Sequence, residues 1–150
     1  FSQILLLFFT MQCACAGSTA GGIKIDRVLL FWKTLFRHVR KSNHNNAVLF
    51  VKLDKKVIDE DVISNSLMYI IIYVVVVFFS AACVSAMGID LMTSISGAAA
   101  TMGNVGPGFG GVSSLGNFSA LPDAVKYIFS ADMLLGRLEI FAFLSIFAKG

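Results

Sequence analysis

The stretch from Gly103 to Gly111 contains the residues of this chain whose types and spacing could hold an ion. Six of its nine residues are glycine or proline, in the order Gly103-Asn104-Val105-Gly106-Pro107-Gly108-Phe109-Gly110-Gly111. Glycine adopts backbone conformations closed to other residues and proline breaks a helix, so no helix or strand passes through it. Irregular backbone can aim its carbonyl oxygens at a cation and replace the water around it. The stretch is therefore a candidate ion-coordinating loop.

The composition places this loop in a membrane protein. Of the 150 residues, 57% are hydrophobic and 14% are charged, against about a quarter charged in soluble domains. Irregular backbone at membrane depth is tolerated only where it lines a cavity or is buried in protein. An ordinary external loop is the competing interpretation, and the apolar segments on both sides favour the ion-coordinating one.

The uncharged segment 91–102 precedes the loop and is too short to cross a bilayer. About twelve helical residues cover about 18 Å, whereas the hydrocarbon core is about 30 Å thick. We expect a re-entrant helix at 91–102 that points the negative end of its dipole at the cation, followed by a filter at 103–108. Asn104-Val105-Gly106-Pro107-Gly108 has the layout of the potassium-channel filter Thr-Val-Gly-Tyr-Gly. This layout predicts that K+ is bound by the carbonyls of Asn104, Val105 and Gly106.

Longer apolar segments flank the re-entrant helix. No charged residue occurs from 62 to 87, which is long enough for a span, and Gly88 is suited to end that helix. Pro122 suits the first turn of a last helix, which we expect to run to about residue 148. These segments predict an all-α membrane protein built on a helix–pore-loop–helix unit.

Arg137 lies inside the last predicted span, about fifteen residues from its start and so near the middle of the bilayer. An arginine at that depth is costly and normally faces a bundle interior or a wet cavity. Glu139 and Asp132 are its neighbours in sequence, but residues two apart on a helix do not face each other, and a spacing of five is little better. We expect Arg137 to reach the pore and tune cation passage there. Neutralisation by Glu139 or Asp132 is the alternative.

A second glycine-rich break lies near the start of the chain. Residues 3–14 are apolar but too short to span, and a helix is predicted to resume at Ile23 and run to Lys41. The break consists of Ala16, Gly17, Ser18, Thr19, Ala20, Gly21 and Gly22. Discontinuous transmembrane helices recur in transporters, where the break tends to mark the ion pathway. The chain begins inside the first apolar run, which we interpret as the middle of a helix.

Basic residues are concentrated between these two regions. Nine of the twelve lysines and arginines lie between Lys24 and Lys56. Such a stretch between apolar segments is typical of a cytoplasmic loop, whereas binding of nucleic acid is disfavoured because the neighbours are membrane spans. Within it, residues 42–58 fit a connector with a small β-hairpin, formed by 48–53 and 57–58 around a polar turn.

The sequence contains no sound motif for covalent chemistry. Gly106, Gly108 and Gly111 match G-x-G-x-x-G, but no strand precedes them and no amphipathic helix follows directly. The segment 17–24 approaches a phosphate-binding loop, but Ile23 interrupts it and no hydroxyl residue follows Lys24. We therefore expect no enzyme activity and no cofactor, with K+ as the transported ion.

Three motifs in register resemble the Trk/Ktr/HKT superfamily of potassium transporters. They are AGSTAGGIK at 16–24, NVGPG at 104–108 and LGRLEIF at 135–141. The resemblance covers nearly the whole chain, which is similar to the C-terminal third of bacterial TrkH/KtrB-like potassium uptake subunits. Position 20 is Ala where many members have Gly, a small change that leaves the match intact.

The resemblance implies a four-repeat architecture around a pseudo-fourfold pore. Residues 1–41 correspond to the broken second helix of the third repeat, 42–58 to a cytoplasmic connector and 59–150 to the fourth repeat. The loop 16–22 corresponds to a gate below the filter, Gly106 to the central filter glycine and Arg137 to the deep arginine of the last repeat. The family also implies a multi-pass protein of the bacterial inner membrane that forms homodimers. It further implies a cytosolic nucleotide-binding ring, TrkA/KtrA-like, as regulatory partner.

On this interpretation the N-terminal repeats of the same polypeptide are missing partners, because one quarter of a filter cannot coordinate an ion alone. A two-helix subunit of residues 59–148 that assembles as a homotetrameric cation pore is the alternative, and it gives the first 41 residues no role. A scaffold segment without a pore is a third possibility. It leaves an arginine at mid-membrane depth unexplained.

Overall fold

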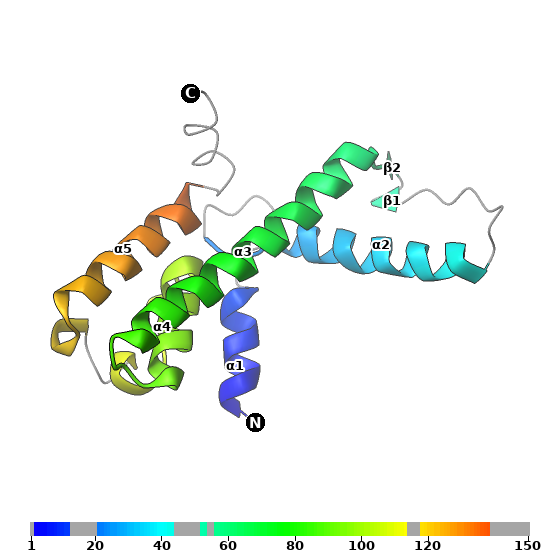
Figure 1. Cartoon of the computed structure of the whole chain (residues 1–150). Coiled ribbons are helices and arrows are strands. Elements are labelled where there is room, and N and C mark those ends of the chain that lie inside the picture. Colours follow the sequence, from blue (N-terminus) through cyan, green and yellow to red (C-terminus); the bar gives the residue numbers. More distant parts are fainter. Residues whose placement is uncertain (1, 13–20, 44–51, 54–55, 114–117, 139–150) are drawn as a thin grey trace.

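The computed structural model describes residues 2–12, 21–43, 52–53, 56–113 and 118–138, and it is mostly helical. In chain order the elements are α1 (Ser2–Met11), α2 (Ile25–Asn43), β1 (Lys52–Leu53), β2 (Lys56–Val57), α3 (Glu60–Ala86), α4 (Leu91–Gly103), the 3-10 turns η1 (Gly110–Val112) and η2 (Phe118–Ala120), and α5 (Asp123–Arg137). Figure 1 shows α3 as the long diagonal helix, and α2, α4 and α5 contact it.

Helix α3 begins and ends at the signals that the sequence carries. Glu60 and Asp61 lie in its first turn, where negative charge stabilises the positive end of the helix dipole. Met87 caps the other end, and Gly88 follows with φ +86°, a left-handed conformation that favours glycine. Among the described helices, α3 is the one long and apolar enough to cross a membrane by length and composition.

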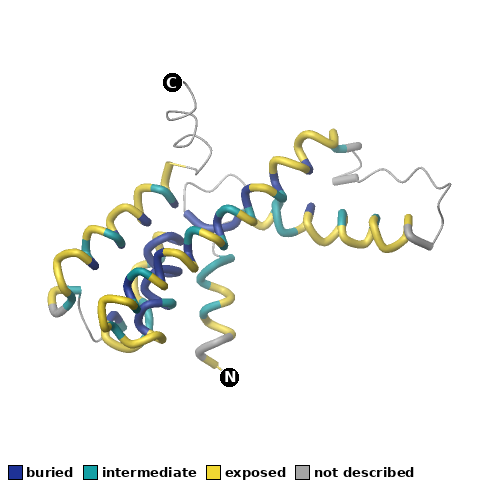
Figure 2. Tube along the Cα trace, in the orientation of Figure 1, coloured by how far each residue is buried: buried dark blue, intermediate teal, exposed yellow. Residues whose placement is uncertain are grey.

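Helix α4 is short and enclosed by the other helices. Asp90 caps its start by accepting hydrogen bonds from the backbone N–H groups of Met92 (3.1 Å) and Thr93 (3.4 Å). Ten of its 13 residues are buried, and they form the dark core of the molecule in Figure 2. Contacts reach it from α1, α3 and α5. Its alanines, serines and glycines let these helices approach closely.

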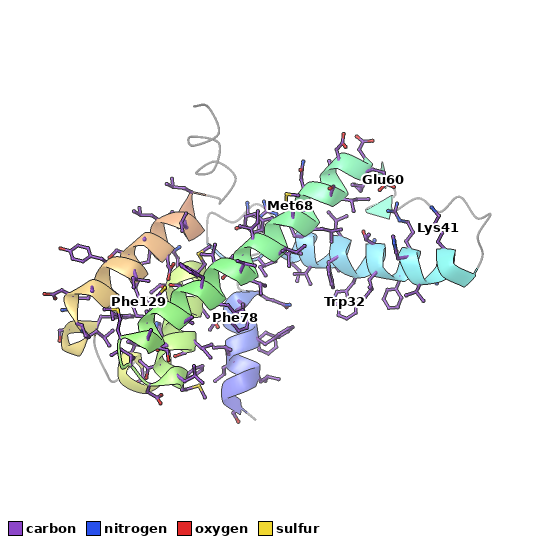
Figure 3. The ribbon with its side chains drawn as sticks, viewed as in Figure 1. Trp32, Lys41, Glu60, Met68, Phe78 and Phe129 are labelled. Atoms are coloured by element: carbon purple, nitrogen blue, oxygen red, sulfur yellow. The ribbon has the colours of Figure 1, made fainter. Side chains whose placement is uncertain are left out.

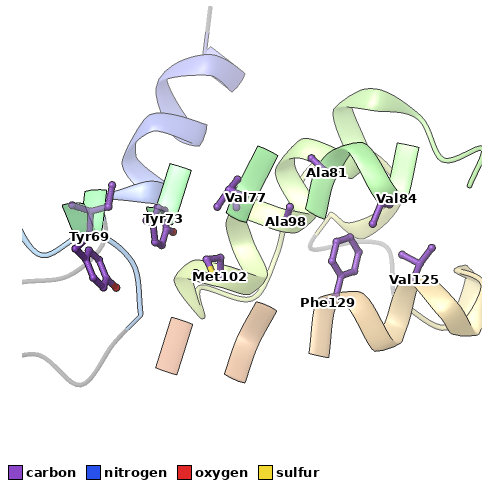
Figure 4. Close-up of a cluster of buried hydrophobic side chains, with 11 residues drawn as sticks. Tyr69, Tyr73, Val77, Ala81, Val84, Ala98, Met102, Val125 and Phe129 are labelled. Carbon is purple, nitrogen blue, oxygen red and sulfur yellow. The ribbon is translucent and has the colours of Figure 1, made fainter. Parts of the chain in front are cut away.

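The core lies where α3, α4 and α5 meet (Figure 4). Tyr73 and Val77 of α3 are buried on one side of α4, and Phe129 of α5 is buried on the other. Phe129 fits because Gly97 of α4 has no side chain, since a Cβ there would lie 2.7 Å from its Cζ atom. The large side chains of the flanking helices thus fill the space that the small residues of α4 leave.

The glycine-rich break separates α1 from α2. The backbone N–H of Ile23 donates to the carbonyl of Met11 (3.1 Å), so the ends of the intervening segment meet. Beyond it, α2 runs in a different direction from α1 (Figure 1), whereas the sequence suggested one interrupted helix. Helix α2 instead lies along the first half of α3, with Leu30 and Ile63 buried between the two helices.

Two arginines also join α2 to α3. Arg37 donates to both carboxylate oxygens of Glu60, at 2.5 and 3.0 Å, and the guanidinium carbon of Arg27 lies 3.7 Å from the ring centroid of Tyr69. The outward side of α2 carries Trp32, which is half exposed, and Figure 3 shows it pointing away from α3. Helix α2 is therefore joined to α3 at two points along its length.

Some predicted boundaries differ from the structure. The antiparallel strands β1 and β2 pair Lys52 with Val57 and Leu53 with Lys56, and residues 48–51 of the predicted hairpin lie outside the described residues. Pro122 is the N-cap of α5 rather than a residue of its first turn. The described part of α5 ends at Arg137, and the predicted continuation to residue 148 lies outside the described residues.

We expect Phe129→Ala to destabilise the fold by about 3 kcal/mol. This value is at the lower end of the range for Phe→Ala substitutions in protein cores, because the lipid around the helices is also apolar and weakens the hydrophobic driving force. The ring is 2% exposed, so its removal leaves a cavity beside Gly97. Thermal unfolding of the purified protein in detergent measures the loss. Tyr127→Ala, on the same helix but at a site that is 77% exposed, is the matched control. Equal melting temperatures for the two variants would show that this core does not hold α5.

Candidate ion-coordinating site

The filter stretch begins with two residues in left-handed conformations. Asn104 caps α4 with φ 54° and ψ 36°, and the backbone N–H of Val105 reaches back to the carbonyl of Ala100 (3.0 Å). Gly106 follows with φ +106°. Asparagine is one of the few residues that tolerate the first conformation, and glycine is the residue suited to the second. The chain therefore turns sharply away from the C-terminal end of α4.

Hydroxyl groups of α4 hold the returning backbone. The Ser96 Oγ accepts from the N–H of Phe109 (2.9 Å), and the Thr93 Oγ1 accepts from the N–H of Gly111 (3.2 Å). Gly108 passes close to α4, since a Cβ there would lie 3.2 Å from the Ser96 carbonyl oxygen. The sequence did not single out Ser96 and Thr93. The available signal was a pair of hydroxyl residues three apart, which share one face of an uncharged helix.

The last turn of α4 is also in close contact with α5. The side-chain amide of Asn104 donates to the Met133 carbonyl (3.2 Å). A Cβ on Gly136 would lie 2.0 Å from the Met102 carbonyl oxygen, so glycine is required for this approach. Gly136 lies within the third motif of the sequence, yet nothing in its local pattern indicated which atom it contacts.

The filter residues themselves are less buried than α4. Asn104, Gly106 and Pro107 are exposed, and Val105 and Gly108 are half buried. Among the described residues, no donor bonds the carbonyl oxygens of Asn104, Val105 or Gly106. The described donors therefore leave these three carbonyls unbonded, whereas the amide groups of Phe109 and Gly111 are held by hydroxyl groups of α4.

The predicted gate loop is described only at its end. Ala16, Gly17, Ser18, Thr19 and Ala20 lie outside the described residues, whereas Gly21 and Gly22 are buried. A Cβ on Gly21 would lie 2.8 Å from both the Met102 carbonyl oxygen and the Asn104 amide nitrogen. The structure thus brings the end of this loop to the same turn of α4 that begins the filter stretch.

The charged residues of α5 separate into different environments. Arg137 directly follows Gly136 and is exposed in this chain. Asp132 is buried and accepts a hydrogen bond from Ser80 of α3. Glu139, the other partner considered, lies outside the described residues. No group of three or more His, Cys, Asp or Glu side chains that could hold a metal occurs in the described part of the chain.

The whole chain, residues 1–150, matches the family model TrkH, described as cation transport protein. The chain belongs to the TrkH family. The family resemblance inferred from the three motifs is therefore confirmed, and so is the mostly helical fold class.

Among TrkH family members, the chain is similar to the Trk system potassium uptake protein TrkH of Escherichia coli, with 35% identity over 147 residues that cover 98% of this chain and 30% of that protein. It is 33% identical over 140 residues to the potassium uptake protein TrkI of Halomonas elongata. The crystal structure of the potassium transporter TrkH from Vibrio parahaemolyticus matches 96% of this chain and 30% of its own, with a TM-score of 0.85 and 32% identity. The chain therefore spans about 30% of the length of these relatives.

We expect Ser96→Ala to loosen the backbone that follows the filter stretch. Loss of the hydrogen bond to Phe109 should speed exchange of that amide hydrogen roughly fivefold, the equivalent of about 1 kcal/mol. Hydrogen–deuterium exchange of the protein in lipid measures it. Ser94→Ala is the control, because Ser94 is equally buried in α4 but bonds the Asp90 carbonyl within its own helix. If the Phe109 amide exchanges at the same rate in all three proteins, Ser96 does not anchor the loop.

Proposed function

We propose that this chain forms the C-terminal part of a Trk-type potassium uptake protein and lines one quarter of its permeation pathway. The observation that supports this most is the end of α4, where a buried half-length helix runs into Asn104, Val105 and Gly106 with their carbonyls unoccupied by the described donors. Similarity to a solved potassium transporter over 96% of the chain supports the same proposal.

In the proposed mechanism, the carbonyl oxygens of Asn104, Val105 and Gly106 replace water around K+. The C-terminal end of α4 adds the negative end of its dipole, which favours a cation at this place. A hydrated ion gives up its shell only when several oxygens replace it together. Corresponding loops from the N-terminal repeats of the same polypeptide would therefore complete the ring around the ion.

The loop 16–22 serves as the gate in this proposal. Its support is the contact of Gly21 with the turn of α4 that precedes the filter stretch. Arg137 would lie below the filter, one residue after the glycine that touches the same turn, and its charge would limit how cations pass. Both roles follow the family resemblance of the motifs at 16–24 and 135–141.

The wider assembly is proposed on the same resemblance. The protein would be a multi-pass protein of the bacterial inner membrane and a homodimer, regulated by a cytosolic nucleotide-binding ring. The basic helix α2 and the connector would face the cytoplasm, because lysines and arginines are retained on that side. The relatives are transporters rather than enzymes, and we propose transport of K+ without covalent chemistry or a resident cofactor. A homotetramer of residues 59–148 is less well supported, since the family match includes residues 1–58.

We expect Gly106→Ser in the complete protein to lower the preference for K+ over Na+ by about tenfold or more, the equivalent of about 1.4 kcal/mol. A side chain at φ +106° is strained, and relief of that strain would rotate the neighbouring carbonyls away from the ion. Uptake of both ions by cells that lack other potassium transport systems measures the preference.

Gly88→Ser is the matched control for this substitution. Gly88 also has a positive φ, and in both glycines an added Cβ meets nothing within 4 Å in this chain. The two variants thus introduce the same kind of backbone strain, but Gly106 lies in the filter stretch whereas Gly88 follows the end of α3. An unchanged ion preference in Gly106→Ser, or an equal loss in Gly88→Ser, would contradict a filter at 104–108.

We expect deletion of two residues from the loop 16–22 to raise K+ uptake, because a shorter loop would obstruct the pathway below the filter less. Initial uptake rates, normalised to the amount of protein in the membrane, measure the effect. A deletion of equal length within residues 44–51 of the connector serves as control. Unaltered or reduced uptake after the loop deletion would show that this loop is not the gate.

A further inference from the structure

Asp132 is a buried carboxyl group that the proposed permeation pathway does not use. It lies in α5, its residue is 4% exposed, and its Oδ2 accepts a hydrogen bond from the Ser80 hydroxyl of α3. A carboxyl group inside a membrane segment is costly and is commonly retained for a function. Its surroundings therefore decide what it could bind.

The surroundings of Asp132 are apolar. It lines a cleft of about 390 Å³ between α3 and α5, whose other walls include Val76 and Phe79 of α3 and Ile128 and Leu135 of α5. Cys83 is the further titratable side chain on this cleft. The hydroxyl of Ser80 thus faces the carboxyl group from an otherwise hydrophobic wall.

No opposite charge compensates Asp132 among the described residues. On α3 the charged residues are Glu60 and Asp61, about 30 Å away along the helix, and α4 has none. On α5 itself, Lys126 pairs with Asp123 at 2.9 Å. Arg137 is exposed and lies five residues further on, which turns it about 140° around the helix.

An ionised carboxylate has about four acceptor positions, and the described residues supply one donor here. Burying such a charge without a partner costs several kcal/mol, so the neutral acid is the favoured form in the cleft. A metal cation would need several oxygen ligands, whereas Ser80 and Asp132 provide the described polar groups of this wall. A proton needs only one carboxylate oxygen.

We propose that Asp132 is a reversible proton-binding site, in which Ser80 holds the neutral carboxyl group in the cleft between α3 and α5. One proton passes from hydronium in water to a carboxylate oxygen, a water molecule is left, and no electron is transferred. Release of the proton leaves a bare charge between two helices that both pack against α4. The cleft must then admit water or widen.

The site also has a physical link to the filter stretch. Asp132 is followed by Met133, whose carbonyl accepts the hydrogen bond from the Asn104 amide. A movement of this turn of α5 on proton release would therefore pull on the residue that begins the filter. This consequence rests on the proposed function, whereas proton binding itself does not.

Infrared difference spectroscopy of the full-length protein in lipid bilayers tests the site. The carbonyl stretch of a protonated carboxylic acid is recorded between about pH 5 and about pH 9, a range in which exposed aspartates stay ionised. We expect a carboxylic acid band that decreases as the pH rises and is absent from Asp132→Asn. Ser80→Ala should keep the band but shift its frequency, because the hydrogen bond is lost.

Asp123→Asn is the matched control, because Asp123 lies on the same helix but is exposed and paired with Lys126. It should leave the band unchanged. A band that is unaltered in Asp132→Asn, or one that does not change with pH in the wild type, overturns the proposal. Ser80→Ala retains the carboxyl group and keeps the test readable if Asp132→Asn fails to fold. The spectra do not depend on transport, so absence of K+ uptake would count against the proposed function and not against this site.

Discussion

In the proposed re-entrant position, helix α4 must be covered by protein, because backbone at membrane depth has no water for its polar groups. The structure meets this requirement with small residues rather than with large ones. Gly97 leaves room for the Phe129 ring, and Gly136 leaves room for the Met102 carbonyl. A Cβ on Gly103 would lie 3.0 Å from the Thr10 carbonyl oxygen of α1. The positions of α1, α3 and α5 all follow from how closely they can approach this one short helix.

This coverage divides the polar groups of the loop into two classes. The N–H groups of Phe109 and Gly111 are bonded by hydroxyls of α4, and that of Gly108 donates to the Val112 carbonyl (2.8 Å). The carbonyls of residues 104–106 receive no such bond from the described residues. Five N–H groups of this stretch, those of Asn104, Val105, Gly108, Phe109 and Gly111, are thus bonded. Bonded donors beside carbonyls that receive no described bond favour a cation over an anion, and this difference is the physical basis of the proposed filter.

The sequence predicted the elements whose signals are local. The uncharged stretch before Gly103 and the glycines after it defined α4 and the loop, and Gly88 marked the end of α3. Pairings between distant segments were not predictable, because the bond of Ser96 to Phe109 depends on the path of the returning chain. The direction of α2 was likewise not predictable, because it depends on the contact with α3, which a glycine-rich break does not specify.

Asp132 and Arg137, near the end of α5, show that the position of a charged residue along a helix does not by itself define its function. Asp132 and Arg137 lie within about 8 Å of helical rise, yet one is buried against Ser80 and the other is exposed. Their separation around the helix axis keeps them from neutralising each other. In the proposed arrangement, α5 presents a proton-binding carboxyl group to α3 and carries Arg137 immediately after Gly136, which contacts the last turn of α4. The proposed proton on Asp132 removes its charge, so this carboxyl group needs no cationic partner on the same helix.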